Sequence, residues 1–173
     1  MTDNSKKNGQ TTFFSPTSGK VHKEAVIKDI VAFIKEDHNA IYKLAIGTDS
    51  HAKENSTKPK RVDFVTAVVI HRKGYGGRYF WQKKTVENIA TLRNRIYTET
   101  MLSVNFAQNF LPELKMSLTN GEKYDLEIHI DVGEKGETRE MIKEVIGIVV
   151  GSGFLAKTKP DSYTASIVAD KYT

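Results

Sequence analysis

The apolar residues of this chain follow the spacing of helices in some stretches and of strands in others. Between residues 21 and 36 they recur at helical spacing and form one stripe. A longer helical stretch begins near residue 92 and would be stopped by Pro112, because proline interrupts helical hydrogen bonding. Two more helices are expected, one over residues 138–150 and one from Pro160 to the C-terminus.

Short runs rich in β-branched residues, bounded by turn residues, indicate strands. They cover residues 41–48, 62–71, 78–86, 126–132 and 154–157. After the first helix the expected order is βββαβαβα, an antiparallel meander followed by strand–helix–strand units that pair in parallel. We therefore expect an α/β fold, a mixed five-stranded sheet flanked by helices. Residues 1–12 are predicted to be a disordered tail and residues 13–173 a single domain.

The amino-acid composition of the chain excludes some classes of function and favours others. Hydrophobic residues make up 39% and charged residues 27% of the 173 residues, which is typical of a soluble globular protein. No apolar run is long enough to cross a bilayer, so no membrane role is expected. The chain has no cysteine, which excludes thiolate–zinc sites and is consistent with the cytoplasm. The net charge of +5 favours a polyanionic partner such as nucleic acid.

One acidic residue lies where an apolar residue is expected. The helix that begins near residue 92 has an apolar stripe made of Leu92, Ile96, Leu102, Phe106 and Phe110. Glu99 falls inside this stripe. An ionised glutamate facing a core costs several kcal/mol unless it is paired or bound to a metal. A salt bridge to a buried arginine, or a position at the rim of the core, would also explain it.

Three aspartates can be placed near Glu99. Asp49 and Asp131 end two predicted strands, and if these strands are parallel neighbours both residues emerge at the same edge of the sheet. Asp170 lies on the last predicted helix, on one face with Tyr163, Ser166 and Ile167. Taken singly, the first two aspartates are equally well explained as turn formers and Asp170 as solvent-exposed. Together with Glu99 they predict an acidic cluster that would repel itself without a cation.

Carboxylate oxygens are ligands that Mg²⁺ prefers, and Mn²⁺ takes the same kind of site. Two such ions about 4 Å apart can activate a water and stabilise the leaving oxygen in phosphodiester cleavage. Asp49, Glu99, Asp131 and Asp170 are therefore the candidate metal ligands and catalytic residues.

The order of these four acids along the elements resembles that of the RNase H-like superfamily. More narrowly, IGTDSH at 46–51, HIDVG at 129–133, KPDSY at 159–163 and ADK at 169–171 are similar to the YkuK-like bacterial family. This resemblance extends from about Phe13 to Thr173 and implies an RNase H-like fold with an undetermined substrate. Relatives that trim strands from a 3′ end carry a second acid two residues after the first, a position that is His51 here.

Four further residues are candidates for contacts with nucleic acid. Ser50, His51 and Lys53 follow Asp49 directly, and Lys159 precedes the last helix. Lysines at this edge could hold phosphates electrostatically, and His51 could assist proton transfer. The stretch 51–61 is equally explained as a solvated loop between two strands.

The sequence therefore favours a metal-dependent nuclease that cleaves phosphodiester bonds of RNA, DNA or a hybrid by a two-metal-ion mechanism. The alternative is a catalytically silent domain of the same fold that binds nucleic acid or serves as a scaffold. Carboxylates more than about 8–10 Å apart, or bonded to arginines, would favour this alternative, because they could not then share metal ions. The oligomeric state is left open.

Overall fold

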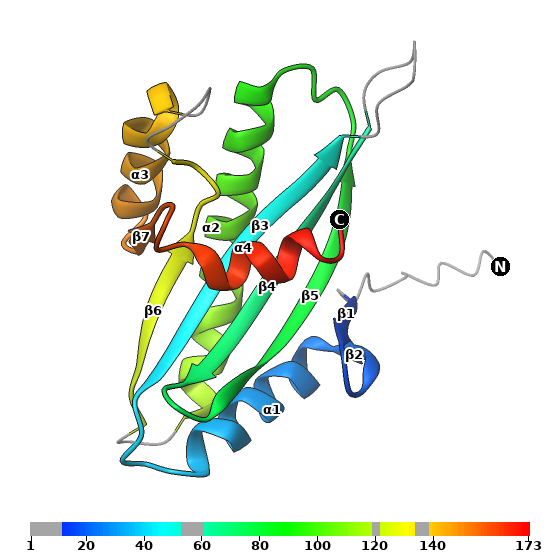
Figure 1. Cartoon of the computed structure of the whole chain (residues 1–173). Coiled ribbons are helices and arrows are strands. Elements are labelled where there is room, and N and C mark those ends of the chain that lie inside the picture. The colour runs from blue at the N-terminus through cyan, green and yellow to red at the C-terminus, as the bar shows by residue number, and fades with distance from the viewer. Residues whose placement is uncertain (1–11, 53–60, 119–121, 134–138) are drawn as a thin grey trace, which may run out of the picture.

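The computed structural model describes residues 12–52, 61–118, 122–133 and 139–173 (Figure 1). These residues form seven strands and four α-helices. The predicted N-terminal tail lies outside the described ranges except for Thr12, which begins the first strand.

The centre of the sheet consists of three long antiparallel strands and two shorter parallel ones. β3 (Tyr42–Ala52), β4 (Val62–Arg72) and β5 (Gly76–Val86) form the predicted meander. β6 (Tyr124–His129) lies parallel to β3, and β7 (Leu155–Lys157) lies parallel to β6. The parallel pairing follows from the helices that connect these strands, because each crossover returns the chain to the same end of the sheet.

The helices cover both faces of the sheet. They are α1 (Lys23–Lys35), α2 (Leu92–Ser117), α3 (Ile142–Gly151), preceded by the 3₁₀ turn η1 (Arg139–Met141), and α4 (Tyr163–Asp170). In Figure 1, α4 crosses one face of the long strands, whereas α2 lies behind them. Within the described ranges, no helix has the length and apolar character needed to cross a membrane.

The main hydrophobic core lies between the sheet and the first three helices. Alternate strand residues point into it, among them Ile46, Val68 and Ile128. On the opposite face, Val65 and Ala67 of β4 pack beneath α4. Because β4 is buried on both faces, it reads in the sequence as a continuous apolar run rather than as an alternating one.

The C-terminal residues hold α4 against the sheet. The ring of Tyr172 stacks on Trp81 of β5, with 3.7 Å between the ring centroids. The hydroxyl groups of Tyr172 and Tyr79 are 3.0 Å apart and hydrogen-bonded. Ala169 is fully buried beneath the helix. These contacts fix the end of α4 and therefore the position of Asp170.

The predicted order βββαβαβα after α1 is confirmed, but the sheet has seven strands rather than five. The additional pair is the hairpin of β1 (Thr12–Ser15) and β2 (Gly19–His22). β1 joins the sheet through the pairing of Phe14 with Trp81, whose rings also stack. Strands of four residues give too short a pattern to be recognised by periodicity.

Several predicted boundaries differ from the observed ones, among them the strand predicted over 126–132, which is β6 and ends at His129. α2 continues through Pro112, which is exposed on the helix surface, while Leu111 and Leu114 beside it are buried. Burial of these leucines offsets the hydrogen bond that proline removes. The predicted loop at 51–61 starts later, because His51 and Ala52 continue β3 and pair with β4.

Candidate functional site

Asp49 and Asp131 come from the same end of two adjacent parallel strands, β3 and β6. The last pair in the parallel register of β3 and β6 is Gly47 with His129, and each aspartate lies two residues beyond that pair. Asp49 is still within β3, whereas Asp131 follows the end of β6. Both are partly exposed, so a cation in solvent can reach this edge.

Glu99 lies in the first half of α2 and is only 6% exposed. The hydroxyl group of Ser50, the residue after Asp49 on β3, donates a hydrogen bond of 2.6 Å to Glu99 Oε1. The guanidinium of Arg95, one turn earlier on α2, lies at 4.0 Å from the same oxygen. Glu99 therefore faces the sheet, as its place in the apolar stripe predicts.

Burial raises the pKa of Glu99 to about 8. The hydrogen bond from Ser50 and the charge of Arg95 lower this pKa, but the carboxylates of Asp49 and Asp131 raise it further. At neutral pH the metal-free protein therefore holds Glu99 mainly protonated. The same effect shows that Asp49, Asp131 and Glu99 are close enough to interact electrostatically.

A buried network of hydroxyl groups aligns α2 with the sheet beside Glu99. Ser103 donates to Thr48 Oγ1 at 2.9 Å, and the hydroxyls of Thr48 and Thr66 are 2.9 Å apart. The same hydroxyl lies 3.0 Å from the carbonyl oxygen of Glu99, one turn earlier on α2, so its single proton is shared between the two acceptors. Thr48 and Ser50 lie on the same face of β3 because side chains alternate along a strand. The network thus fixes the register of Glu99 against Ser50.

Lys159 supplies a cation to the same edge. Its ammonium is 2.8 Å from Asp131 Oδ1, and its backbone N–H donates to the carbonyl of Val132. The hydrogen bond to Asp131 raises the pKa of Lys159, and the charges of Asp131, Asp49 and Asp170 raise it further. The negative charges of all three aspartates therefore stabilise the charged form of Lys159.

Asp170 is exposed near the C-terminal end of α4, which crosses the other face of the sheet. It acts on Lys159, whereas Glu99 lies on the α2 side and interacts mainly with Asp49 and Asp131. Glu99 and Asp170 therefore lie on opposite sides of the sheet. Within the described ranges, however, no three His, Asp or Glu side chains are grouped so that they could hold a metal ion as they stand.

The candidate residues for nucleic acid have different surroundings. Ser50 is buried, and its hydroxyl is directed at Glu99. His51 belongs to β3 and pairs with Asp63, while Lys53 lies outside the described residues. The side chain of Lys159 is 59% exposed and can reach solvent while it contacts Asp131.

Sequence reasoning did not identify the contacts that Ser50 and Arg95 make with Glu99. The position of Arg95 four residues before Glu99 on the same helix was the available signal, because such residues are neighbours on a helix surface. Nothing local in the sequence indicated Ser50, since its contact depends on how α2 packs against β3.

A family model described as "Ribonuclease H-like" matches residues 25–173. The chain is also similar to "Uncharacterized protein YkuK" of Bacillus subtilis (strain 168), with 35% identity over 170 residues. That alignment covers 93% of this chain and 96% of the relative. The comparison with solved structures gave no significant match.

Proposed function

The chain belongs to the ribonuclease H-like family, and from this premise we propose that it hydrolyses phosphodiester bonds in nucleic acid with the aid of divalent cations. The proposed ligands are Asp49, Asp131, Asp170 and Glu99. The observation that carries the proposal is that Asp49 and Asp131 stand at equivalent positions of two adjacent parallel strands, with the carboxyl group of Glu99 hydrogen-bonded to Ser50, the residue after Asp49.

The donor chemistry of this edge fits Mg²⁺ or Mn²⁺. All four side chains offer carboxylate oxygens, and the three aspartates act together on the ammonium of Lys159. Carboxylates that attract the Lys159 ammonium would also attract a metal cation, which would compete with that ammonium for Asp131. When bound, divalent cations would polarise the phosphoryl oxygen and provide an activated water.

The residues of the chain would prepare this chemistry in separate ways. Ser50 holds one oxygen of Glu99, so the side chain is fixed before a cation arrives. Glu99 must lose its proton to become a ligand, because burial keeps it protonated. Lys159 pairs with Asp131, and its exposed ammonium would contact a phosphate of the substrate.

Replacement of Asp49 by Asn tests the proposal. Asn keeps the shape of the side chain but removes its charge. We expect hydrolysis of labelled RNA, DNA and hybrid substrates in Mn²⁺ to fall by about 100-fold or more, because metal ligation contributes several kcal/mol to the transition state. The melting temperature should be unchanged or higher, since one charge leaves a repelling cluster.

Asp125→Asn is the matched control. Asp125 is exposed at the start of β6, far from the acidic edge, and the change removes the same charge. This variant should cleave at the wild-type rate. Equal cleavage by wild type and the Asp49→Asn variant would exclude Asp49 as a ligand.

A catalytically silent nucleic-acid-binding domain is the second candidate. The 2.8 Å ion pair between Lys159 and Asp131 favours it, because a basic side chain already neutralises part of the cluster. In that case the wild type would bind the labelled substrates but release no product in Mg²⁺ or Mn²⁺. Salt-dependent binding without cleavage would identify this function.

A further inference from the structure

The residues that follow Asp170 join the end of α4 to β5. The ring of Tyr172 lies almost parallel to that of Trp81, with 10° between the ring planes. Its hydroxyl is hydrogen-bonded to that of Tyr79, which lies on the same strand. An aromatic pair contributes to stability beyond the apolar area that it buries. Tyr172 therefore attaches the C-terminal segment to two residues of β5.

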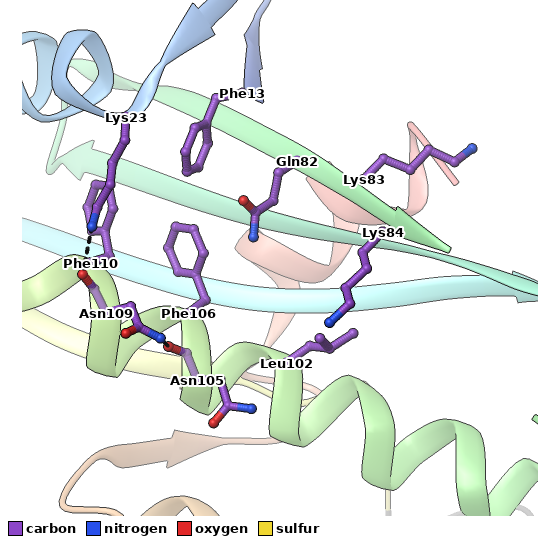
Figure 2. A pocket seen from close by; sticks show the side chains of 10 residues that line it. All are labelled: Phe13, Lys23, Gln82, Lys83, Lys84, Leu102, Asn105, Phe106, Asn109 and Phe110. Atoms are coloured by element: carbon purple, nitrogen blue, oxygen red, sulfur yellow. Dashed lines mark hydrogen bonds between the residues drawn. The ribbon is translucent and has the colours of Figure 1, made fainter. Parts of the chain in front are cut away.

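This attachment lies on the face of the sheet that α4 crosses. Figure 2 shows Gln82 and Lys84 directed from β5 toward α2, whereas Lys83 points away from α2. Side chains alternate along a strand, so Trp81 lies on the same face as Lys83. There it packs in one apolar cluster with Ala169 of α4.

Asp49 also lies on this face of the sheet. It pairs with Val65 of β4, which packs beneath α4, and paired residues of neighbouring strands point to the same face. The charges of Asp49 and Asp170 both raise the pKa of Lys159, so the end of α4 is within electrostatic reach of the end of β3. Two aspartates placed in this way repel each other when no cation is bound.

α4 has few other contacts with which to resist this repulsion. It has eight residues, and a helix of this length is not stable by itself in water. At its C-terminal end Ile167 is 63% exposed, and the buried side chain of Ala169 is small. The ring of Tyr172 is therefore the largest apolar group that holds this end of the helix to the sheet.

We propose that Tyr172 is a positioning residue for Asp170: its stack on Trp81 keeps the Asp170 carboxylate beside Asp49, and this stack and a bound divalent cation stabilise each other. The inference rests on the proposed function, because it requires a cation that Asp170 helps to bind.

The coupling follows from thermodynamic linkage. When the end of α4 leaves the sheet, Asp170 leaves with it, so only the docked segment presents the complete set of carboxylates. The apparent affinity for a cation is then reduced in proportion to the docked fraction. Because linkage is reciprocal, a cation that prefers the docked segment must also hold it against the sheet.

The docking itself can be measured on the full chain without metal. Trp81 is the one tryptophan of the sequence, so its fluorescence reports the stack. In EDTA, Tyr172→Ala should shift the Trp81 emission to longer wavelength, because more of the ring meets water. Amide hydrogens at the C-terminal end of α4 should exchange about tenfold faster than in the wild type, the equivalent of one aromatic pair. Tyr172→Phe keeps the ring and should restore both values nearly to those of the wild type.

Addition of Mg²⁺ tests the coupling through the same amides. Mg²⁺ should slow their exchange in the wild type, because a bound cation stabilises the docked segment. Asp170→Asn should remove most of this protection. Exchange at the end of α4 that is the same with and without Mg²⁺ in the wild type would overturn the coupling.

A double-mutant cycle separates positioning of Asp170 from a general structural role. Tyr172→Ala should weaken Mn²⁺ binding, measured by calorimetry, by up to about tenfold. In the Asp170→Asn background the same change should have no further effect, because the residue that it positions is already gone. Tyr75→Ala is the control: Tyr75 is 77% exposed in the turn between β4 and β5, and its loss should leave Mn²⁺ binding unchanged.

Wild-type Mn²⁺ affinity in Tyr172→Ala, or an equal loss of affinity with and without Asp170, would overturn this inference. If binding depends on Asp49 but not on Tyr172, only this inference fails. If Tyr172 and the cation are coupled as described but no nucleic acid is cleaved, only the proposed hydrolysis fails. A wild type that binds neither Mg²⁺ nor Mn²⁺ would contradict both.

Discussion

A single buried carboxyl group, that of Glu99, links the sequence to the candidate site. Its place in an apolar stripe was visible in the sequence because helical periodicity sets which face a residue occupies. The pKa of about 8 follows from that burial together with the neighbouring aspartates. Glu99 is therefore the residue whose protonation should dominate the pH dependence of the metal-free protein.

Replacement of Glu99 by Gln should remove a pH-dependent loss of stability. Burial raises the pKa of Glu99 to about 8 in the folded state, from the ordinary glutamate value of 4.5 that applies in the unfolded chain. Between these values the folded state holds a proton that the unfolded state has lost, so the free energy of unfolding falls as pH rises toward 8. The variant should match the wild type near pH 5 and be more stable near pH 9, by several kcal/mol.

Urea unfolding in EDTA across this pH range measures the effect. Glu140→Gln is the control, because Glu140 is exposed and its replacement should leave the slope unchanged. A wild-type stability that rises or stays level from about pH 5 to pH 8, once the control slope is subtracted, would contradict the assigned pKa.

Lys159 offers a second test at the scale of one side chain. In the absence of metal the ammonium of Lys159 neutralises part of the negative charge of the aspartates. If it competes with a metal ion for this charge, Lys159→Gln should tighten Mn²⁺ binding measured by calorimetry. The accompanying loss of stability in EDTA should stay within about 1 kcal/mol, because the side chain is 59% exposed and screened by solvent. Weaker Mn²⁺ binding in this variant would instead show that Lys159 supports the metal site.

At the scale of elements, the order of helices and strands along the chain was predictable from the sequence, whereas several of their first and last residues were not. Helical and strand periodicity predicted α1, the meander and the parallel strands, because each of these elements buries one or both faces. The β1–β2 hairpin was missed because each strand has four residues. The continuation of α2 past Pro112 was missed because a local rule was applied where tertiary packing of Leu111 and Leu114 prevails.

Pro112→Ala should therefore stabilise the protein. Alanine restores the missing N–H within α2 and removes the steric conflict, a gain of up to about 3 kcal/mol. The more flexible unfolded chain reduces this gain by about 1 kcal/mol. A net increase of about 1–2 kcal/mol in urea unfolding is expected. A destabilised variant would show that the proline bends α2 into the geometry that buries Leu114.

The candidate site was predictable only as a set of residues. The parallel pairing of β3 and β6 made the neighbourhood of Asp49 and Asp131 an expectation of topology. The hydroxyl of Ser50 and the ammonium of Lys159 reach the acids through packing between distant segments, which no local pattern encodes. Whether all four acids bind a cation together therefore stays a prediction.

At the scale of the whole molecule, a chain with a net charge of +5 places Asp49 and Asp131 at the same end of two adjacent parallel strands. A divalent cation that binds the folded state there should raise the melting temperature, because it relieves repulsion that the unfolded chain does not have. The remaining basic surface would stay available to phosphates, so metal binding and binding of a polyanion would not compete for the same charges.

Metal binding and the protonation of Glu99 should be linked. If Glu99 is a ligand, a cation must displace the proton that burial retains up to a pKa of about 8. The increase in melting temperature caused by millimolar Mg²⁺ should therefore be small near pH 6 and grow toward pH 9, because proton competition weakens as Glu99 ionises. In Glu99→Gln, which has no proton to lose, the increase should be smaller than in the wild type near pH 9 and nearly independent of pH.

Asp49→Asn should show little increase in melting temperature at any pH, since Asp49 is proposed as a ligand whatever the protonation state of Glu99. A wild-type increase that is the same near pH 6 and pH 9 would mean that the cation binds the aspartates without Glu99, and no Mg²⁺ effect at either pH would contradict the metal site itself.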